Sequence, residues 1–218
     1  MNFFCDIFLA ALVVVNLALA GVSRLPNVIR IVGFQGFMIG LLPFVITGEH
    51  LGLSAVNMLV KGVLMPFMLT YAMKKAKTSR EIEPLVSFGK SIAIVFAITL
   101  ASFYFCEVKQ IDCAYATRLA IPLAFATIST GLFIIVSRRK AISQVLGFLV
   151  FENGVSVFAA GIAMEYGLVI ELGILLDVFV LVFILGIAIF EINRTFSSID
   201  TDRLNRLGDL GHLHRAGK

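Results

Sequence analysis

The stretch that decides the fold reads AISQVLGFLVFENGVSVFAAGIAM from Ala141 to Met164 and, after a short turn, GLVIELGILLDVFVLVFILGIAIF from Gly167 to Phe190. Each run is long enough to cross the core of a bilayer as an α-helix. Glu152 lies eleven residues into the first run and Asp177 ten residues into the second, which predicts both carboxyl groups near the membrane midplane. A carboxylate at that depth costs at least a few kcal/mol unless it is neutralised, paired or hydrated. The two acids are therefore candidates for function.

Composition favours a membrane protein. Of the 218 residues 59% are hydrophobic and 15% charged, with a mean hydropathy of +0.98, whereas a soluble domain of this length needs more polar surface. The start has neither a basic segment nor a small-residue cleavage site, so we expect a retained first helix. The predicted fold is an all-α polytopic membrane protein with a transmembrane domain in residues 1–192 and a short cytoplasmic tail in residues 193–218. About seven transmembrane helices are expected, at residues 3–22, 31–47, 53–73, 91–106, 118–136, 141–164 and 167–191.

The basic residues predict the orientation of these helices. With seven helices, 15 of the 18 lysines and arginines fall on one side of the membrane, and only Lys109 and Arg118 fall on the other. Basic loops stay on the cytoplasmic side. We therefore expect a multi-pass protein of the cell inner membrane with its N-terminus outside and its C-terminus in the cytoplasm. The tail alternates charges with leucines and is expected to pack on a partner subunit or on lipid headgroups.

An internal repeat is predicted from matching residues at a constant spacing of 114: Ser23, Arg24, Gly33, Phe34 and Gly40 correspond to Ser137, Arg138, Gly147, Phe148 and Gly154. The pattern indicates two parallel three-helix units, residues 1–73 and 118–192, joined by a spacer helix at 91–106. With a small gap the register continues, so that Lys61 falls opposite Asp177. The small residues of both units, with Gly36, are expected to let helices approach closely.

Lys61 is the third ionisable residue inside a predicted span. Asn57 lies four residues before it on the same helical face, and Pro66 is expected to free the carbonyl of Gly62 and kink the helix. Desolvation favours the neutral form of a lysine and of a carboxylic acid. Lys61 could therefore exchange protons with Glu152 and Asp177 if water reaches them. The alternative is a static pair that holds helices together.

Further polar residues lie near these three. Glu171, close to the outer end of the last span, could serve as a station for Asp177, although it lies on a different helical face. Asn153 and Gln144 could hydrogen-bond the Glu152 carboxyl group, or they could hold helices together.

No metal or cofactor site is predicted. The histidines are scattered and the cysteines lack the paired spacing of a zinc or iron–sulfur site. Cys106 and Cys113 could form a disulfide or remain thiols. The sequence contains neither a phosphate-binding loop nor a dinucleotide fingerprint.

Several motifs together resemble component E of hydrogenase-4, a membrane subunit of group 4 nickel–iron hydrogenases and formate hydrogenlyase-type complexes. They are GFLVFENG at 147–154, ELGILLD at 171–177, DTDRL at 200–204, KGVLMP at 61–66 and LTYA at 69–72. The last three predicted helices are also similar to the K subunit of complex I and the C subunit of multisubunit sodium/proton antiporters.

The resemblance implies that Glu152 takes the role of the family's intramembrane glutamate. It also implies a chain that is not an enzyme by itself and has no cofactor. The expected partners are antiporter-like and other membrane-arm subunits and, indirectly, peripheral hydrogenase or electron-transfer subunits; lipid is expected and nucleic acid is not. The chain would then contribute to proton or sodium translocation.

Two other functions compete with that one. A purely structural anchor subunit predicts that Glu152 and Asp177 can each be made neutral without loss of coupling. A stand-alone transporter is disfavoured by the short loops.

Overall fold

The computed structural model describes residues 2–47, 51–75, 85–110 and 118–162, together with single positions of the last apolar segment between 173 and 186. The regular structure of this part of the chain is helical, as predicted. Its elements are α1 (Asn2–Gly21), α2 (Leu25–Thr47), α3 (Leu51–Leu59), η1 (Val60–Leu64), α4 (Met65–Lys75), α5 (Phe88–Lys109), α6 (Ala120–Ser137) and α7 (Ala141–Ile162). Five stretches in the described part are long and apolar enough to cross a membrane, and α1 adds a shorter apolar helix. The chain is an all-α integral membrane protein.

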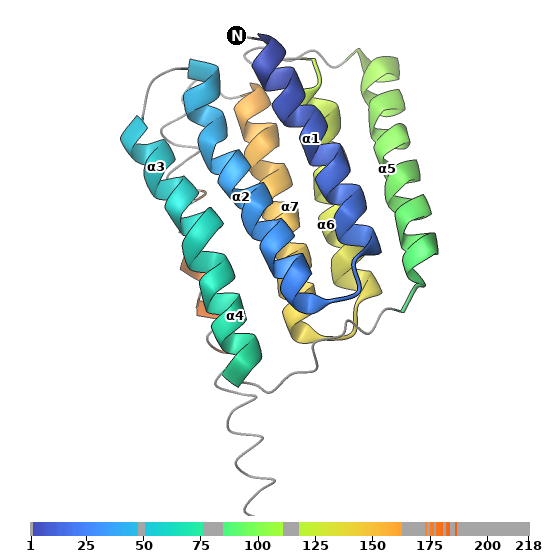
Figure 1. Ribbon diagram of the computed structural model, residues 1–218. Helices are drawn as coiled ribbons and strands as arrows, with labels where there is room; N and C mark the ends of the chain where they lie inside the picture. Colours follow the sequence, from blue (N-terminus) through green and yellow to red (C-terminus); the bar gives the residue numbers. More distant parts are fainter. Residues whose placement is uncertain are drawn as a thin grey trace, which may run out of the picture.

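The helices run alternately up and down in an upright bundle (Figure 1). The segments α3, η1 and α4 follow one another along one edge and are here called the rod; α5 forms the opposite edge. Between these edges α1 and α2 stand in front of α6 and α7. The central helix is α2, which contacts α1, the rod and α7. Any side chain that reaches from the rod to α7 therefore passes beside α2.

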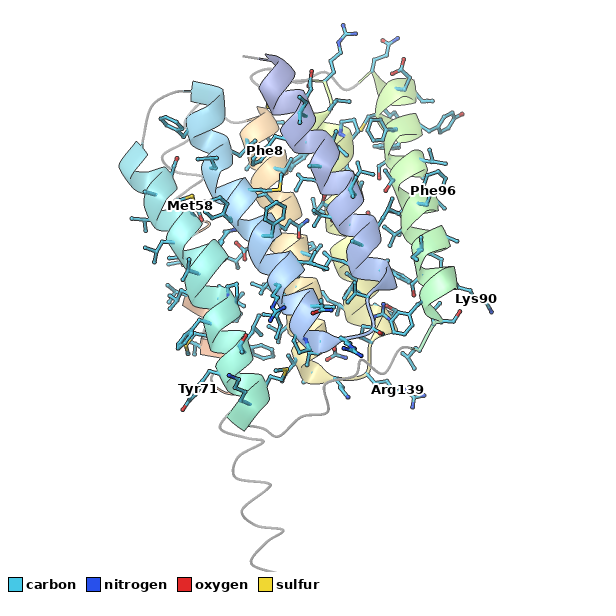
Figure 2. All side chains as sticks on the ribbon, in the orientation of Figure 1. Phe8, Met58, Tyr71, Lys90, Phe96 and Arg139 are labelled. Carbon is cyan, nitrogen blue, oxygen red and sulfur yellow. The ribbon has the colours of Figure 1, made fainter. Side chains whose placement is uncertain are left out.

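The two ends of the bundle differ in charge. Because the helices alternate in direction, α1, α4 and α6 end where α2, α5 and α7 begin. This end is here called the basic end, and Lys90 and Arg139 project from it (Figure 2). The opposite end, where α1 and α3 begin, is called the N-terminal end.

The second and fourth predicted helices extend furthest beyond their predicted bounds. The second helix begins at Leu25 instead of residue 31, with Pro26 in its first turn, where the missing N–H has no partner in the helix in any case. Arg30, which had marked the boundary, lies exposed on this helix. The predicted spacer helix at 91–106 extends to Phe88 and Lys109.

The rod contains a π-helical turn at Val60–Leu64, and Lys61 lies within it. The N–H of Met65 donates to the carbonyl of Val60, five residues earlier. Pro66 follows directly and has no N–H to continue the regular ladder. The sequence had predicted a disturbance of the helix before Pro66, and its form is a widened turn. Such turns occur often at functional sites.

Glycines of α2 make close contact with the rod, and this contact is here called the rod seam. A Cβ at Gly36 would lie 2.9 Å from both the Cβ and the carbonyl oxygen of Lys61, and one at Gly40 would lie 2.5 Å from the Cα of Met58. Larger residues would push the backbones apart. The close approach predicted for Gly36 and Gly40 is confirmed.

A second glycine contact, here called the α6–α7 seam, joins those two helices. A Cβ at Gly131 would lie 2.3 Å from the backbone nitrogen of Phe151, and one at Gly154 would lie 2.5 Å from that of Ile128. Both helices are regular at these positions. The predicted close approach at Gly154 is confirmed, and Gly131 is an addition from the structure.

Arg138 ties helix ends together at the basic end. It was expected as a loop charge, but its side chain is buried, with 2% of its area exposed. Its Nη2 donates to the carbonyl of Ala20 at 3.2 Å, and its guanidinium carbon lies 5.2 Å from the centre of the Phe88 ring. Burial lowers the pKa of this guanidinium below its ordinary value. The basic end is therefore closed by a side chain that links α1, α5 and α6.

Candidate functional site

Lys61 of the rod and Glu152 of α7 form an ion pair inside the bundle. The Lys61 ammonium donates to Glu152 Oε1 and, at 3.2 Å, to the hydroxyl of Ser156 one turn further along α7. Lys61 is 4% exposed and Glu152 is 1% exposed. A buried pair contributes little net stability, but removing one member leaves an uncompensated charge, which is costly. Two ionisable residues that the sequence placed inside predicted spans are thus in direct contact.

The glycines of α2 and the π-turn explain how Lys61 reaches α7. Gly36 lets the backbone of Lys61 approach α2 closely. A lysine side chain that starts so close to α2 is long enough to extend past this helix to α7. The π-turn sets the direction from which the side chain starts. The local helix geometry therefore positions the Lys61 ammonium, and Glu152 of α7 accepts its hydrogen bond.

One oxygen of the pair and two oxygens on the buried face of the rod have no hydrogen-bond partner among the described residues. Ser54 Oγ, Asn57 Oδ1 and Glu152 Oε2 are buried and have no hydrogen-bond partner among the described residues. Ser54 and Asn57 lie on the same face of the rod as Lys61. A buried polar oxygen without a partner costs about 1–3 kcal/mol. These atoms can accept hydrogen bonds from water or from a donor on another segment.

A chain of side-chain amides, here called the amide chain, leads from the pair across the bundle. Asn153 Nδ2, next to Glu152, donates to Gln35 Oε1 at 3.5 Å, and Gln35 Nε2 donates to Asn16 Oδ1 at 3.0 Å. Asn16 Nδ2 donates to Thr127 Oγ1 at 2.9 Å, and that hydroxyl donates to the carbonyl of Leu123 at 2.8 Å. Each link donates in the same direction. The amide chain connects α7, α2, α1 and α6 and fixes Asn153 beside the carboxylate.

The predicted site residues divide into three groups. Asn153 directly follows Glu152 in the sequence and Asn57 lies one helical turn before Lys61; both are buried, and Asn153 hydrogen-bonds Gln35 instead of Glu152. Gln144 is exposed and donates to the backbone carbonyl of Arg138 at 3.2 Å, so it serves the turn before α7 and does not reach Glu152. Asp177 and Glu171 lie outside the described residues.

Several functional candidates were missed in the sequence: Asn16, Gln35, Ser54, Thr127 and Ser156. The signal that singled out Glu152 was a strongly polar group inside an apolar run. Applied to uncharged amides, the same criterion selects Asn16 and Gln35. Hydroxyls carry no such signal, because a serine or threonine in a membrane helix can bond its own helix, as Thr130 does to the carbonyl of Ala126 at 2.7 Å.

A small cavity adjoins the pair. Its volume is about 10 Å³, at the lower limit for one water molecule, and its polar lining comes from Lys61, Glu152 and Asn153. In the part of the chain that the structure describes, no three His, Cys, Asp or Glu side chains come together as a metal site would require. Cys113 lies outside that part, so its pairing with Cys106 stays a prediction.

Two kinds of known protein have sequences similar to this chain. Rv0085 from Mycobacterium tuberculosis is 29% identical over 211 residues, which cover 94% of this chain and 96% of that protein. Hydrogenase-4 component E from Escherichia coli K12 is 27% identical over 156 residues, or 71% of each chain, and the protein of that name from Shigella flexneri gives the same values. The chain is similar to hydrogenase-4 component E. The predicted resemblance is confirmed; no protein-family model and no solved structure matches.

Proposed function

We propose that this chain is a membrane subunit of a hydrogenase-type, complex I-like assembly and that it helps to move protons while partner subunits transfer electrons. The observation that carries the proposal is the buried Lys61–Glu152 pair, which joins the rod to α7 between apolar helices long enough to span a membrane. Ionisable residues at such depth are rare and usually mark ion pathways. The similarity to hydrogenase-4 component E supplies the context of a complex with several components.

The chemistry of the pair favours a proton over a metal cation. The Lys61 ammonium already neutralises the Glu152 carboxylate by donating to Oε1, which weakens the attraction of this group for Na⁺. An ammonium and a carboxylate can instead share or pass a proton, and the balance between their charged and neutral forms depends on water and on neighbouring charge. Asp177 and Glu171 are proposed to extend the path beyond the described residues.

Hydrogenase or quinone chemistry is assigned to partner subunits, and antiporter-like membrane subunits are the proposed neighbours of this chain. Its orientation is proposed to place the basic end in the cytoplasm. The support is the positive charge of that end, where the exposed Lys90 and Arg139 project.

The deciding experiment measures redox-driven proton uptake by membrane vesicles that contain the intact complex. We expect Glu152→Gln to reduce proton uptake per electron towards background at unchanged abundance of the complex, because the amide cannot accept the proton of Lys61. Glu107→Gln is the matched control, since Glu107 is an exposed carboxylate near the end of α5.

A structural anchor gives the opposite result. If uptake per electron with Glu152→Gln equals that of the wild type and of Glu107→Gln, the pair serves only to hold the rod against α7.

A further inference from the structure

The buried face of the rod changes character at Lys61. Towards the N-terminal end this face carries Asn57 and Ser54, four and seven residues away, within one stripe of the helix. Towards the basic end it carries Met65 and Leu69. All five side chains are buried. The ion pair thus lies at the boundary between a polar half and an apolar half of the same seam.

The polar half offers partners for water. Ser54 is 2% exposed and Asn57 is 5% exposed, and Ser54 Oγ and Asn57 Oδ1 have no hydrogen-bond partner among the described residues. On α7, Glu152 Oε2 is likewise unpaired, and Ser156 lies one turn nearer the N-terminal end. Oxygens spaced by about one helical turn can each bind water molecules that also bond to one another. Ser54 is only three residues from Leu51, where α3 begins, so this row of polar side chains extends almost to the start of the helix.

The apolar half of the rod face offers no hydrogen-bond partner for water. Met65 and Leu69 belong to a hydrophobic core that also contains Leu25, Val32 and Leu149 from α2 and α7. Met65, Leu69 and Leu149 line the cavity at the pair, and no polar side chain lines it apart from Lys61, Glu152 and Asn153. Beyond this core, the buried Arg138 bonds the end of α1. Ser143 Oγ and Arg138 Nη1, which have no hydrogen-bond partner in the described part of the chain, lie on this side and belong to residues that line a separate cavity of about 10 Å³. Val32 lines both this cavity and the one at the pair, so water from the basic end would have to pass an apolar layer to reach Lys61 and Glu152.

We infer that Ser54 and Asn57 line a one-sided water path, through which the Lys61–Glu152 pair exchanges with water from the N-terminal end of the bundle and not from the basic end. The inference rests on the proposed function and adds to it the side of the membrane that the pair faces. With the basic end in the cytoplasm, that side is the outer one.

Cysteine accessibility tests the path in the intact complex. In a background where Cys5, Cys106 and Cys113 are serines, single cysteines are introduced by Ser54→Cys, Asn57→Cys and Leu69→Cys. Vesicles of either orientation are treated with a charged, membrane-impermeant thiosulfonate, and the thiols left unreacted are then counted with a maleimide dye. We expect Ser54→Cys and Asn57→Cys to be modified from the N-terminal side alone, and Leu69→Cys from neither side.

Two further variants calibrate the measurement. Ser102→Cys is the matched control for Ser54→Cys, because the Ser102 hydroxyl bonds the carbonyl of Ile98 at 2.9 Å on its own helix; it should stay unmodified from both sides. Arg139→Cys, exposed at the basic end, should react from that side alone. Since Ser54→Cys replaces a single atom, it keeps the test decisive where Asn57→Cys lowers the abundance of the complex.

The inference is overturned if Ser54→Cys stays unmodified from the N-terminal side, or if Leu69→Cys reacts from the basic side. These outcomes are separable from failure of the proposed function. Normal proton uptake with Glu152→Gln, together with modified Ser54→Cys, would keep the water path and reject the ion-transport role. Lost uptake with Glu152→Gln, together with unmodified Ser54→Cys, would keep the ion-transport role and reject the water path.

Discussion

The rod seam and the α6–α7 seam are both built on glycines, yet they have different roles. In the α6–α7 seam, Gly131 and Gly154 meet the backbones of regular helices, and the nearby hydroxyl of Thr130 bonds its own helix. In the rod seam, Gly36 meets the backbone of a π-turn, and the seam contains an ion pair and unpaired oxygens. The comparison teaches that close helix approach can serve either rigid packing or the placement of a charge.

The positions that the predicted repeat makes equivalent also differ between the two seams. Gly33 corresponds to Gly147 at the spacing of 114 residues, but the two face different neighbours. A Cβ at Gly33 would lie 2.5 Å from Pro66, on the helix that follows, whereas one at Gly147 would lie 2.8 Å from the nitrogen of Ile135, on the helix that precedes. Equivalent sequence positions therefore support unlike contacts, and the repeat itself stays a prediction.

The largest effect is expected from breaking the ion pair in the rod seam. Glu152→Ala leaves the buried Lys61 without its counter-charge and should lower the free energy of unfolding by about 3–5 kcal/mol. The double variant Lys61→Met with Glu152→Leu should recover most of this loss. Thermal unfolding of the detergent-solubilised protein measures both, with Glu107→Ala as the exposed control. Equal stability of the single and double variants would show that the pair carries no buried charge.

The α6–α7 seam should respond next, through packing alone. In Gly131→Ala the new methyl group would meet the backbone of Phe151, and we expect a loss of about 1–3 kcal/mol with little change in proton uptake per electron. Gly89→Ala is the matched control, since no atom lies within 4 Å of a Cβ there; it should be neutral or stabilising by up to about 1 kcal/mol. If the two variants unfold at the same temperature, the seam is looser than described.

Gly36→Ala should reverse that pattern. The new methyl group would meet Lys61 at 2.9 Å, a milder overlap than at Gly131, so we expect a loss near the lower end of about 1–3 kcal/mol. Because the overlap moves the π-turn that carries Lys61, proton uptake per electron should fall more than stability does. Vesicle uptake and thermal unfolding, measured on Gly36→Ala and Gly131→Ala together, test the contrast. Parallel losses in both assays would remove the distinction between the two seams.

The smallest effect is expected from the amide chain. Gln35→Leu leaves Asn153 Nδ2 and Asn16 Oδ1 without their partner, and side-chain hydrogen bonds between membrane helices contribute about 1 kcal/mol. Thr130→Val, which removes only a bond within one helix, is the control and should cost less. A stability difference between these two variants in the opposite sense would contradict a role for the amide chain in holding Asn153.

The sequence predicted the ionisable groups better than their surroundings. Lys61 and Glu152 stood out because a charge inside an apolar run has few explanations, and a static pair was one of the two alternatives weighed for Lys61. Their contact could not be derived, because it depends on a π-turn that no spacing rule indicates. Gln144 shows the converse: it shares a helical face with Glu152 in a pattern of 3.6 residues, but it lies close enough to the helix start to bond the preceding turn.

Helix ends were predicted less well than helix existence, for a physical reason. Arg30 and Lys90 are charged and were assigned to loops, whereas both lie within helices at the basic end. Long basic side chains reach water from the turns near either end of a membrane helix, so charge indicates the depth of a residue more reliably than it indicates where a helix ends.

The π-turn can also be regarded as one surplus residue in the rod. A regular helix rotates by about 100° per residue, so one surplus residue in the turn changes the phase between α3 and α4 by about that angle. The stripe of Ser54 and Asn57 and the stripe of Met65 and Leu69 therefore face the same seam although they belong to helices of different phase. The rod is therefore two helices of different rotational phase, and Lys61 lies in the turn that connects them.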